Sequence, residues 1–118
     1  MHIRKGCFMN SPLETEVLQL HAEICAGLAD PSRIMILYAL VDGSRNVTEI
    51  CNELSVPQPS VSRHLKILRE RRMVIAERQG TVVQYSLADH RLVEALDLLR
   101  AVLRDGIAKR AELIDAIS

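Results

Sequence analysis

The chain has 118 residues, of which 48% are apolar and 25% are charged, and its formal net charge is zero. This length suits one domain, and the apolar share is large enough to form a core, so the composition excludes a disordered chain. Aromatic residues make up only 3% and Trp is absent, so the core must be aliphatic, which favours packed helices over a sandwich of strands.

The sequence carries no sign of a membrane segment. No apolar run approaches the roughly 18 residues that a bilayer span requires, and the first residues lack the apolar stretch of a signal peptide. We therefore expect a cytoplasmic protein without a membrane partner. The three cysteines are an odd number, and in a reducing compartment we expect thiols rather than a disulfide framework.

The first predicted helix carries an apolar stripe and ends near Ala29. Asn10 or Ser11, before Pro12, provides its start signal. The stripe consists of Leu13, Val17, Leu20, Ile24 and Leu28, which follow one another at helical spacing. One face of this helix is therefore available for packing.

Three further helices are predicted between this first helix and residue 71. The first of them begins at Pro31, with Asp30 as its N-cap, and is stopped by Asp42-Gly43. A short helix, 47–54, is followed by the tight connection at 55–57 that is typical of a helix-turn-helix. The recognition helix then runs from about residue 58 to 71.

The recognition helix has one apolar face and one polar face. Val61, Leu65 and Leu68 share the apolar face, so the opposite face carries the side chains that can meet DNA. The free N–H groups of the first turn favour a phosphate, and Arg63 is long enough to reach O6 and N7 of a guanine. The residues predicted to read the major groove are Gln58, Ser60, Ser62, Arg63 and Lys66.

A β-hairpin is predicted to follow as the wing. Segments 73–78 and 82–87 alternate in strand fashion around Gln79-Gly80-Thr81. We expect Arg78, Gln79 and Thr81 at its tip to touch the flanking DNA backbone or the minor groove. The alternative is an ordinary solvent-exposed turn.

Basic residues concentrate in this same region. Residues 57–84 include six basic and two acidic side chains, a net charge of +4, and the remainder of the chain carries −4. Phosphate contact requires a local basic face rather than a basic protein. A solvated charge run is the alternative interpretation.

The last predicted helix has a second apolar stripe, too long for one small domain to cover. We therefore predict a homodimer formed through the first and last helices, which would place two recognition helices about one turn of DNA apart. The predicted interface residues are Leu13, Val17, Leu20, Leu92, Leu96, Leu99 and Leu103.

Gly106 is expected to kink or end the last helix. The expected organisation is an N-terminal arm, 1–12, a winged-helix domain, 13–105, and a helical extension, 106–118, in a mainly α fold with one small β-hairpin.

Three motifs in order carry a family resemblance. Residues 28–37 read LADPSRIMIL, residues 58–65 read QPSVSRHL, and residues 80–87 read GTVVQYSL. Together they resemble the ArsR/SmtB family of metal-responsive winged-helix repressors, over residues 13 to 103. The resemblance implies a homodimer that binds a double-stranded operator palindrome near the genes it represses and leaves it when an inducer binds.

The sequence departs from that family at the sensor positions. The Cys-x-Cys pair of its arsenite and soft-metal sensors is replaced by Asn46 and Thr48. The family's other site, across the last helix, would use Asp89, Arg91, Val102 and Asp105. Because an Arg cannot ligate a metal and adds a positive charge, we expect no zinc or nickel site there.

Cys7, Cys25 and Cys51 remain the candidate sensors. In some relatives thiols of the N-terminal arm complete a site with the helix before the recognition helix, so Cys7 and Cys51 could meet, also across a dimer. Three thiolates suit arsenic(III) or a soft metal ion as inducer, and His21 lies four residues before Cys25 as a further potential ligand. The alternative for each cysteine is burial in the core or against the partner. No other cofactor is expected.

No catalytic arrangement is present in the sequence, so we do not expect an enzyme. His64 lies beside the apolar face of the recognition helix, where it is expected to brace the helix or touch phosphate rather than bind metal.

Two alternatives to a metal-responsive repressor stay open. One is a thiol redox-sensing repressor, in which Cys7 pairs with another thiol. The other is a winged-helix protein-interaction module whose basic face meets an acidic partner.

Overall fold

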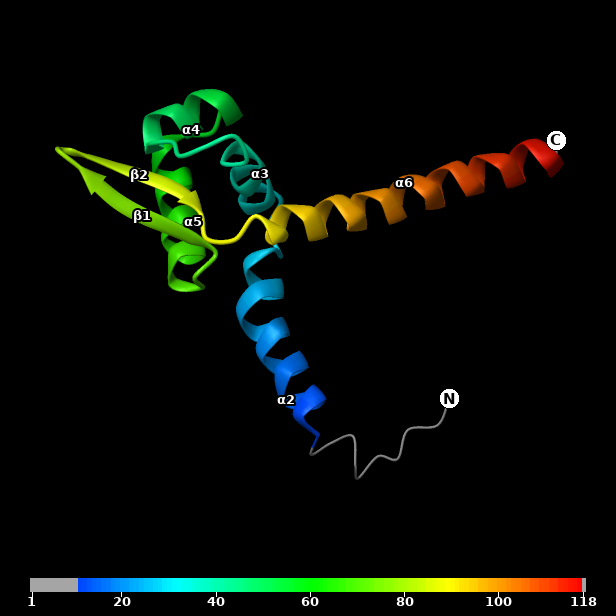
Figure 1. Ribbon diagram of the computed structural model, residues 1–118. Coiled ribbons are helices and arrows are strands. Elements are labelled where there is room, and N and C mark those ends of the chain that lie inside the picture. The colour runs from blue at the N-terminus through cyan, green and yellow to red at the C-terminus, as the bar shows by residue number, and fades with distance from the viewer. Residues whose placement is uncertain (1–10, 118) are drawn as a thin grey trace. The chain divides into compact units, whose positions relative to one another are not determined.

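The structure is a computed structural model that describes residues 11–117 (Figure 1). It divides into two compact units, one up to Ala88 and the other from Asp89 onward. The elements are α2 (Pro12–Gln19), η1 (Leu20–Cys25), α3 (Pro31–Ala39), α4 (Val47–Leu54), α5 (Gln58–Glu70), β1 (Val74–Gln79), β2 (Val82–Leu87) and α6 (Arg91–Ile117). The prediction of a mainly α fold with one hairpin is confirmed.

The first helix begins as its capping signal predicts. Ser11 Oγ accepts a hydrogen bond from the N–H of Glu14 at 3.1 Å, and Pro12 occupies the first helical position. Beyond Gln19 the helix continues as the π-helix η1, and the N–H of Ala26 donates to the carbonyl of His21, five residues earlier. The sequence pattern predicts helix here but does not distinguish a π turn from an α turn. In Figure 1, α2 extends away from α3, α4 and α5.

The core of the first unit lies between α3, α4, α5 and the start of the hairpin. It is aliphatic, as the composition predicts, and burial of each large side chain stabilises the fold by about 1.5 to 3 kcal/mol. Its largest fully buried residues are Ile36, Leu37, Leu40, Ile50, Val61, Leu65, Leu68 and Met73.

Side chains and a left-handed residue set the ends of α3 and α4. The Asp30 carboxylate accepts from the N–H of Ser32 at 2.8 Å, which confirms it as an N-cap. Asn46 and Glu49 form a reciprocal capping box, with both bonds at 2.8 Å. Ser55, in the αL conformation, ends α4 and turns the chain toward α5.

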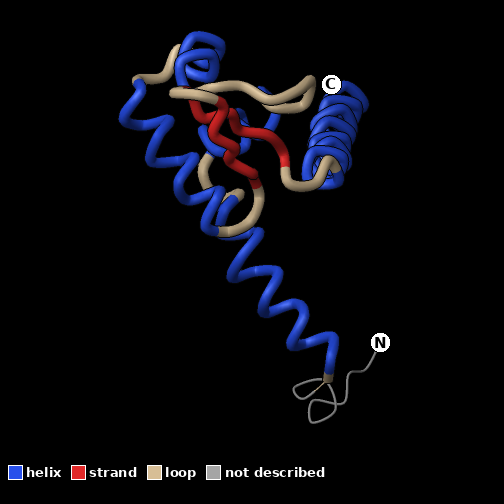
Figure 2. The backbone as a smooth tube through the Cα atoms, turned by 60° about the vertical axis from the view of Figure 1, so that its left-hand side comes forward, coloured by secondary structure: helices blue, strands red, loops and turns tan. Residues whose placement is uncertain are grey.

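The hairpin is antiparallel, with Val74 opposite Leu87 and Gln79 opposite Val82. The two residues between the strands include Gly80 at a φ of +68°, a conformation that glycine adopts without steric cost. Arg45, before α4, exchanges two main-chain hydrogen bonds with Tyr85 of β2, at 2.9 and 2.8 Å. Figure 2 shows the two strands, in red, lying together among the helices of this unit.

The second unit is one helix, α6. The expectation that the helix ends at Gly106 is wrong, because α6 continues without interruption to Ile117. A glycine costs a helix about 1 kcal/mol relative to alanine. That cost is too small to stop a helix whose neighbouring residues are mainly Ala, Leu, Arg and Lys. No helix within residues 11–117 has the length and apolar character that crossing a membrane requires.

Candidate nucleic-acid interface

Helix α5 separates its buried and exposed residues as predicted. Val61, Leu65 and Leu68 are fully buried, whereas Arg63 and Lys66 are exposed. Within the described residues neither of these two cations forms an ion pair. The helix therefore turns a polar, cationic face to solvent. Of the other side chains predicted to read DNA, Gln58 and Ser62 are exposed and Ser60 is half-buried.

The first turn of α5 offers fewer main-chain donors than expected. Pro57 is the N-cap and makes no side-chain cap. The N–H groups of Ser60 and Val61 both donate to the Pro57 carbonyl at 3.1 Å, and Pro59 has no N–H. Phosphate binding at this helix end must therefore depend mainly on side chains.

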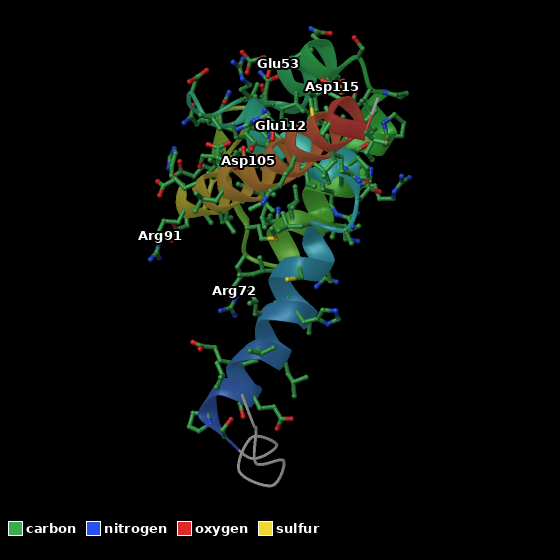
Figure 3. All side chains as sticks on the ribbon, turned by 90° about the vertical axis from the view of Figure 1, so that its right-hand side faces the viewer. Glu53, Arg72, Arg91, Asp105, Glu112 and Asp115 are labelled. Carbon is green, nitrogen blue, oxygen red and sulfur yellow. The ribbon has the colours of Figure 1, made fainter. Side chains whose placement is uncertain are left out.

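The wing tip is solvent-exposed. Arg78, Gln79 and Thr81 are all exposed at the end of the hairpin that is remote from the core. Arg45 holds β2 in place: besides its main-chain pairing, its Nε donates to the carbonyl of Ala39 at 2.8 Å, and its Nη2 lies 3.3 Å from a carboxylate oxygen of Glu53. Glu53 is labelled in Figure 3. No sequence pattern marks Arg45, and only the fold shows that it joins the wing to α4.

His64 lies on the core side of α5, where it is 5% exposed. Its Nδ1 is 3.2 Å from Nη1 of Arg33, on α3. Burial, opposed by the charge of Asp30 and reinforced by those of Arg33 and Arg63, holds the pKa of His64 below its ordinary value. The buried ring contacts Arg33 of α3 and so braces α5, which is one of the two roles predicted for it.

The structure describes two of the three cysteines. Cys25 is exposed on η1, so the core of a single chain does not bury it, and Cys51 is half-buried on α4. Cys7 lies outside the described residues. Within those residues no group of three or more potential ligands among His, Cys, Asp and Glu lies close enough to hold a metal ion.

Asp89 and Arg91, at the start of the last helix, form an ion pair. Arg91 contacts both carboxylate oxygens of Asp89, with Nη2 at 2.7 Å and Nε at 3.1 and 3.2 Å. The hydrogen bonds from Arg91 lower the pKa of Asp89 to about 2. This carboxylate is therefore engaged by the guanidinium of Arg91. Figure 3 labels Arg91 and, further along α6, Asp105.

The predicted dimer residues of the first helix are exposed in the single chain. The exposed fractions are 55% for Leu13, 45% for Val17 and 47% for Leu20. In α6, Leu99 and Leu103 are exposed, Leu92 is half-buried and Leu96 is buried. Exposed aliphatic side chains at helical spacing are typical of a surface that a partner covers.

The chain is similar in sequence to bacterial transcription regulators. Residues 30–76 match the model of a family described as "Bacterial regulatory protein, arsR family". The HTH-type transcriptional repressor SmtB of Mycobacterium tuberculosis is 40% identical over 107 residues, covering 91% of this chain and 73% of that protein.

Two solved structures have the same fold as this chain. A homodimeric winged helix-turn-helix DNA-binding domain from Mycobacterium bovis, a possible ArsR-family regulator, superposes with a TM-score of 0.70 at 26% identity, covering 83% of this chain and 91% of that one. The cadmium metal-sensor CMTR of Mycobacterium tuberculosis superposes with a TM-score of 0.57 at 40% identity, covering 66% and 81%.

Proposed function

The chain belongs to the arsR family of bacterial regulatory proteins, and from that premise we propose that it is a homodimeric, cytoplasmic repressor that binds an operator palindrome and is released by an inducer. Members of this family are DNA-binding transcription regulators and not enzymes. The single observation that carries the proposal is the exposed face of α5. Arg63 and Lys66 are exposed there and form no ion pair within residues 11–117, on a helix whose opposite face is buried in the core.

In this proposal the polar face of α5 enters the major groove. Arg63 donates to O6 and N7 of a guanine, because its two-pronged guanidinium matches that pair of acceptors. Lys66 and the hydroxyls of Ser60 and Ser62 contact phosphates or base edges, and the wing tip contacts the flanking backbone. The domain that does this is residues 13–105, with 106–118 as a helical extension.

Homodimer formation follows from the apolar stripes. Leu13, Val17 and Leu20 are about half exposed in the single chain, and a two-fold axis would bury the same residues of both copies together. The homodimeric Mycobacterium bovis domain of the same fold supports this arrangement. Two copies of α5 would then read two half-sites.

The proposed inducer is arsenic(III) or a soft metal ion bound through thiols. The similar CMTR protein is a cadmium sensor, and thiolates favour soft ions. Cys25 is accessible on η1, while Asp89 is occupied by Arg91. Cys7, Cys25 and Cys51 are therefore the sensor residues of this proposal.

Fluorescence anisotropy tests repressor and sensor together. The reduced protein is titrated onto a duplex that it has itself selected from a randomised library, and arsenite, cadmium, zinc and peroxide are then added in turn. We expect tight binding that arsenite or cadmium reverses, and no reversal when all three cysteines are replaced by serine. Reversal by peroxide alone would support the redox alternative. Normal induction of the triple Cys→Ser variant would rule out both thiol mechanisms.

A further inference from the structure

Two arginines join the carboxyl end of the first helix to the recognition helix. Arg71, the residue that ends α5, donates through Nη1 to the carbonyls of Ala22 and Glu23, the latter at 3.3 Å. Both carbonyls belong to η1. A side chain that bonds to the main chain of a helix in this way is one of the recognised accompaniments of local helix distortion.

Arg33 makes the second connection, from α3. Its Nε donates to the carbonyl of Gly27 at 2.8 Å and its Nη2 to that of Ala26 at 3.4 Å. Its Nη1 lies 3.2 Å from Nδ1 of His64. Because a guanidinium only donates, Nδ1 is the acceptor in this contact. One planar side chain thus bonds in three directions and links the end of the first helix to the buried side of α5.

Side chains at the end of α5 and just after it pack closely against the backbone of Gly27. Gly27 is buried, and a Cβ atom added there would lie 2.5 Å from Sδ of Met73 and 3.2 Å from Cδ of Arg71. Met73 lies three residues after Glu70, the last residue of α5, and is itself buried. Arg72, which precedes Met73, has a φ of +61°, so the chain turns sharply beside this contact.

We propose that Arg33 and Arg71 are positioning residues for DNA binding, which fix the angle of α5 against the first helix without touching DNA. The inference rests on the proposed function, because it requires α5 to be the helix that enters the groove. The first helix is also half of the proposed dimer surface. These bonds therefore set both the tilt of each recognition helix and its placement relative to its copy. The bonds of Arg71 also connect the π segment, which bears Cys25, to the end of α5.

A tilt error and a lost phosphate contact have different consequences. Phosphate attraction tolerates small changes of orientation and dominates binding to random DNA. Hydrogen bonds to base edges do not tolerate such changes, and they supply the preference for one sequence. A positioning residue therefore affects the ratio of the affinities for selected and random duplexes. A phosphate-binding residue affects both affinities alike and lowers the salt dependence.

The matched variants Arg71→Met and Arg72→Met distinguish a positioning residue from a phosphate-binding one. Both remove one positive charge from adjacent positions. The side chain of Arg72 is exposed and has no hydrogen bond or ion pair within the described part of the chain, and Figure 3 shows it directed outward. Affinities are measured by fluorescence anisotropy over a salt series, on the duplex selected by the wild-type protein and on a random duplex. Circular dichroism and thermal unfolding verify that each variant is folded.

For Arg71→Met we expect about tenfold weaker binding to the selected duplex, less than about twofold weaker binding to the random one, and an unchanged salt slope. Arg72→Met should leave the ratio of the two affinities at the wild-type value. A parallel loss on both duplexes, with a salt slope reduced by about 0.9 for Arg71→Met, would show a phosphate contact and overturn the proposal. An unchanged ratio would also overturn it.

Lysine substitutions provide an independent signature. Arg71 uses only Nη1 for both of its bonds, so Arg71→Lys should restore most of the lost ratio. Arg33 uses all three of its nitrogens, so Arg33→Lys should lower the ratio of the affinities for the selected and the random duplex. His64→Asn keeps an acceptor for Nη1 of Arg33 and should lower this ratio less. If Arg33→Lys folds and binds like the wild type, Arg33 has no positioning role. If the wild-type protein selects no duplex at all, the proposed function fails and this inference falls with it.

Discussion

Three consecutive residues of α5 have three different environments. Arg63 is exposed, His64 is buried against Arg33, and Leu65 is fully buried. The sequence pattern predicts the first and the last, because helical periodicity assigns each to a face. It leaves His64 between two alternatives, since its partner Arg33 lies 31 positions away in the sequence. Only tertiary structure can supply such a contact.

At Arg63 we predict a loss of DNA affinity without a loss of stability. Arg63→Ala should weaken binding to the selected duplex by about 1 to 3 kcal/mol, because a bidentate contact to guanine is lost. Its thermal unfolding should be unchanged, since the side chain is exposed. Anisotropy and calorimetry measure the two quantities. Unchanged affinity would remove Arg63 from the reading residues.

At His64 we predict that stability depends on pH. Burial, countered by Asp30 and reinforced by Arg33 and Arg63, lowers the pKa of His64 from its ordinary 6.5. The unfolded chain therefore binds more protons than the folded chain near pH 6. The free energy of unfolding should be highest above pH 6.5 and should fall as the pH drops through the lowered pKa of the folded state.

The His64→Asn variant isolates this contribution. Its amide oxygen can accept from Arg33 but does not titrate, so its free energy of unfolding should change less between pH 7 and pH 5. The carboxylates of Asp30 and Asp89, whose pKa values are also lowered, titrate below this window. Urea unfolding at several pH values gives the comparison. Parallel curves for the two proteins would contradict the account.

At the scale of elements, local signals predict the helix-turn-helix well and the long helices less well. The bounds of α4 agree with its prediction, because a capping box starts it and Ser55 ends it within the sequence itself. These signals do not predict the π-helix in the first helix or the continuity of α6 through Gly106. Apolar spacing does not distinguish a π turn from an α turn, and one glycine such as Gly106 is a weak stop signal.

The two faces of α5 give a prediction for the element as a whole. Leu65→Ala should lower the free energy of unfolding by about 2 to 5 kcal/mol, because it leaves a cavity in a fully buried site. The neighbouring Lys66→Ala should change stability by no more than about 0.5 kcal/mol but should weaken DNA binding. Urea unfolding and anisotropy separate the two effects. If Lys66→Ala were the more destabilising variant, the assignment of the faces would be wrong.

At the scale of the whole molecule, the sequence indicates an uncovered surface but not its geometry. The stripes of the first helix and α6 are visible in the spacing of their leucines, and much of the first stripe is exposed in the single chain. The pairing of two copies depends on contacts between chains, which no periodicity specifies. The same holds for a sensor shared between two chains, because its ligands would meet through contacts that no periodicity specifies.

The proposed dimer is tested by a charge placed in the first stripe. Leu20→Glu should weaken dimerisation by about 2 kcal/mol or more, because two apolar side chains are lost and two carboxylates would have to be desolvated. Gln19→Glu, which adds the same charge to the adjacent position, should have little effect. Analytical ultracentrifugation measures the dimer dissociation constant. Equal constants for the two variants would place Leu20 outside the interface.

The salt dependence of DNA binding tests the central claim, that the exposed face of α5 reads DNA, most directly. The affinity of the wild-type protein is measured by anisotropy over a salt series on a palindrome that it has selected and on a random duplex. The account predicts steep loss of affinity with salt on both duplexes, and a preference for the palindrome of about a thousandfold or more. Equal, weak and salt-independent binding to the two duplexes would contradict it and would instead favour a protein-interaction module.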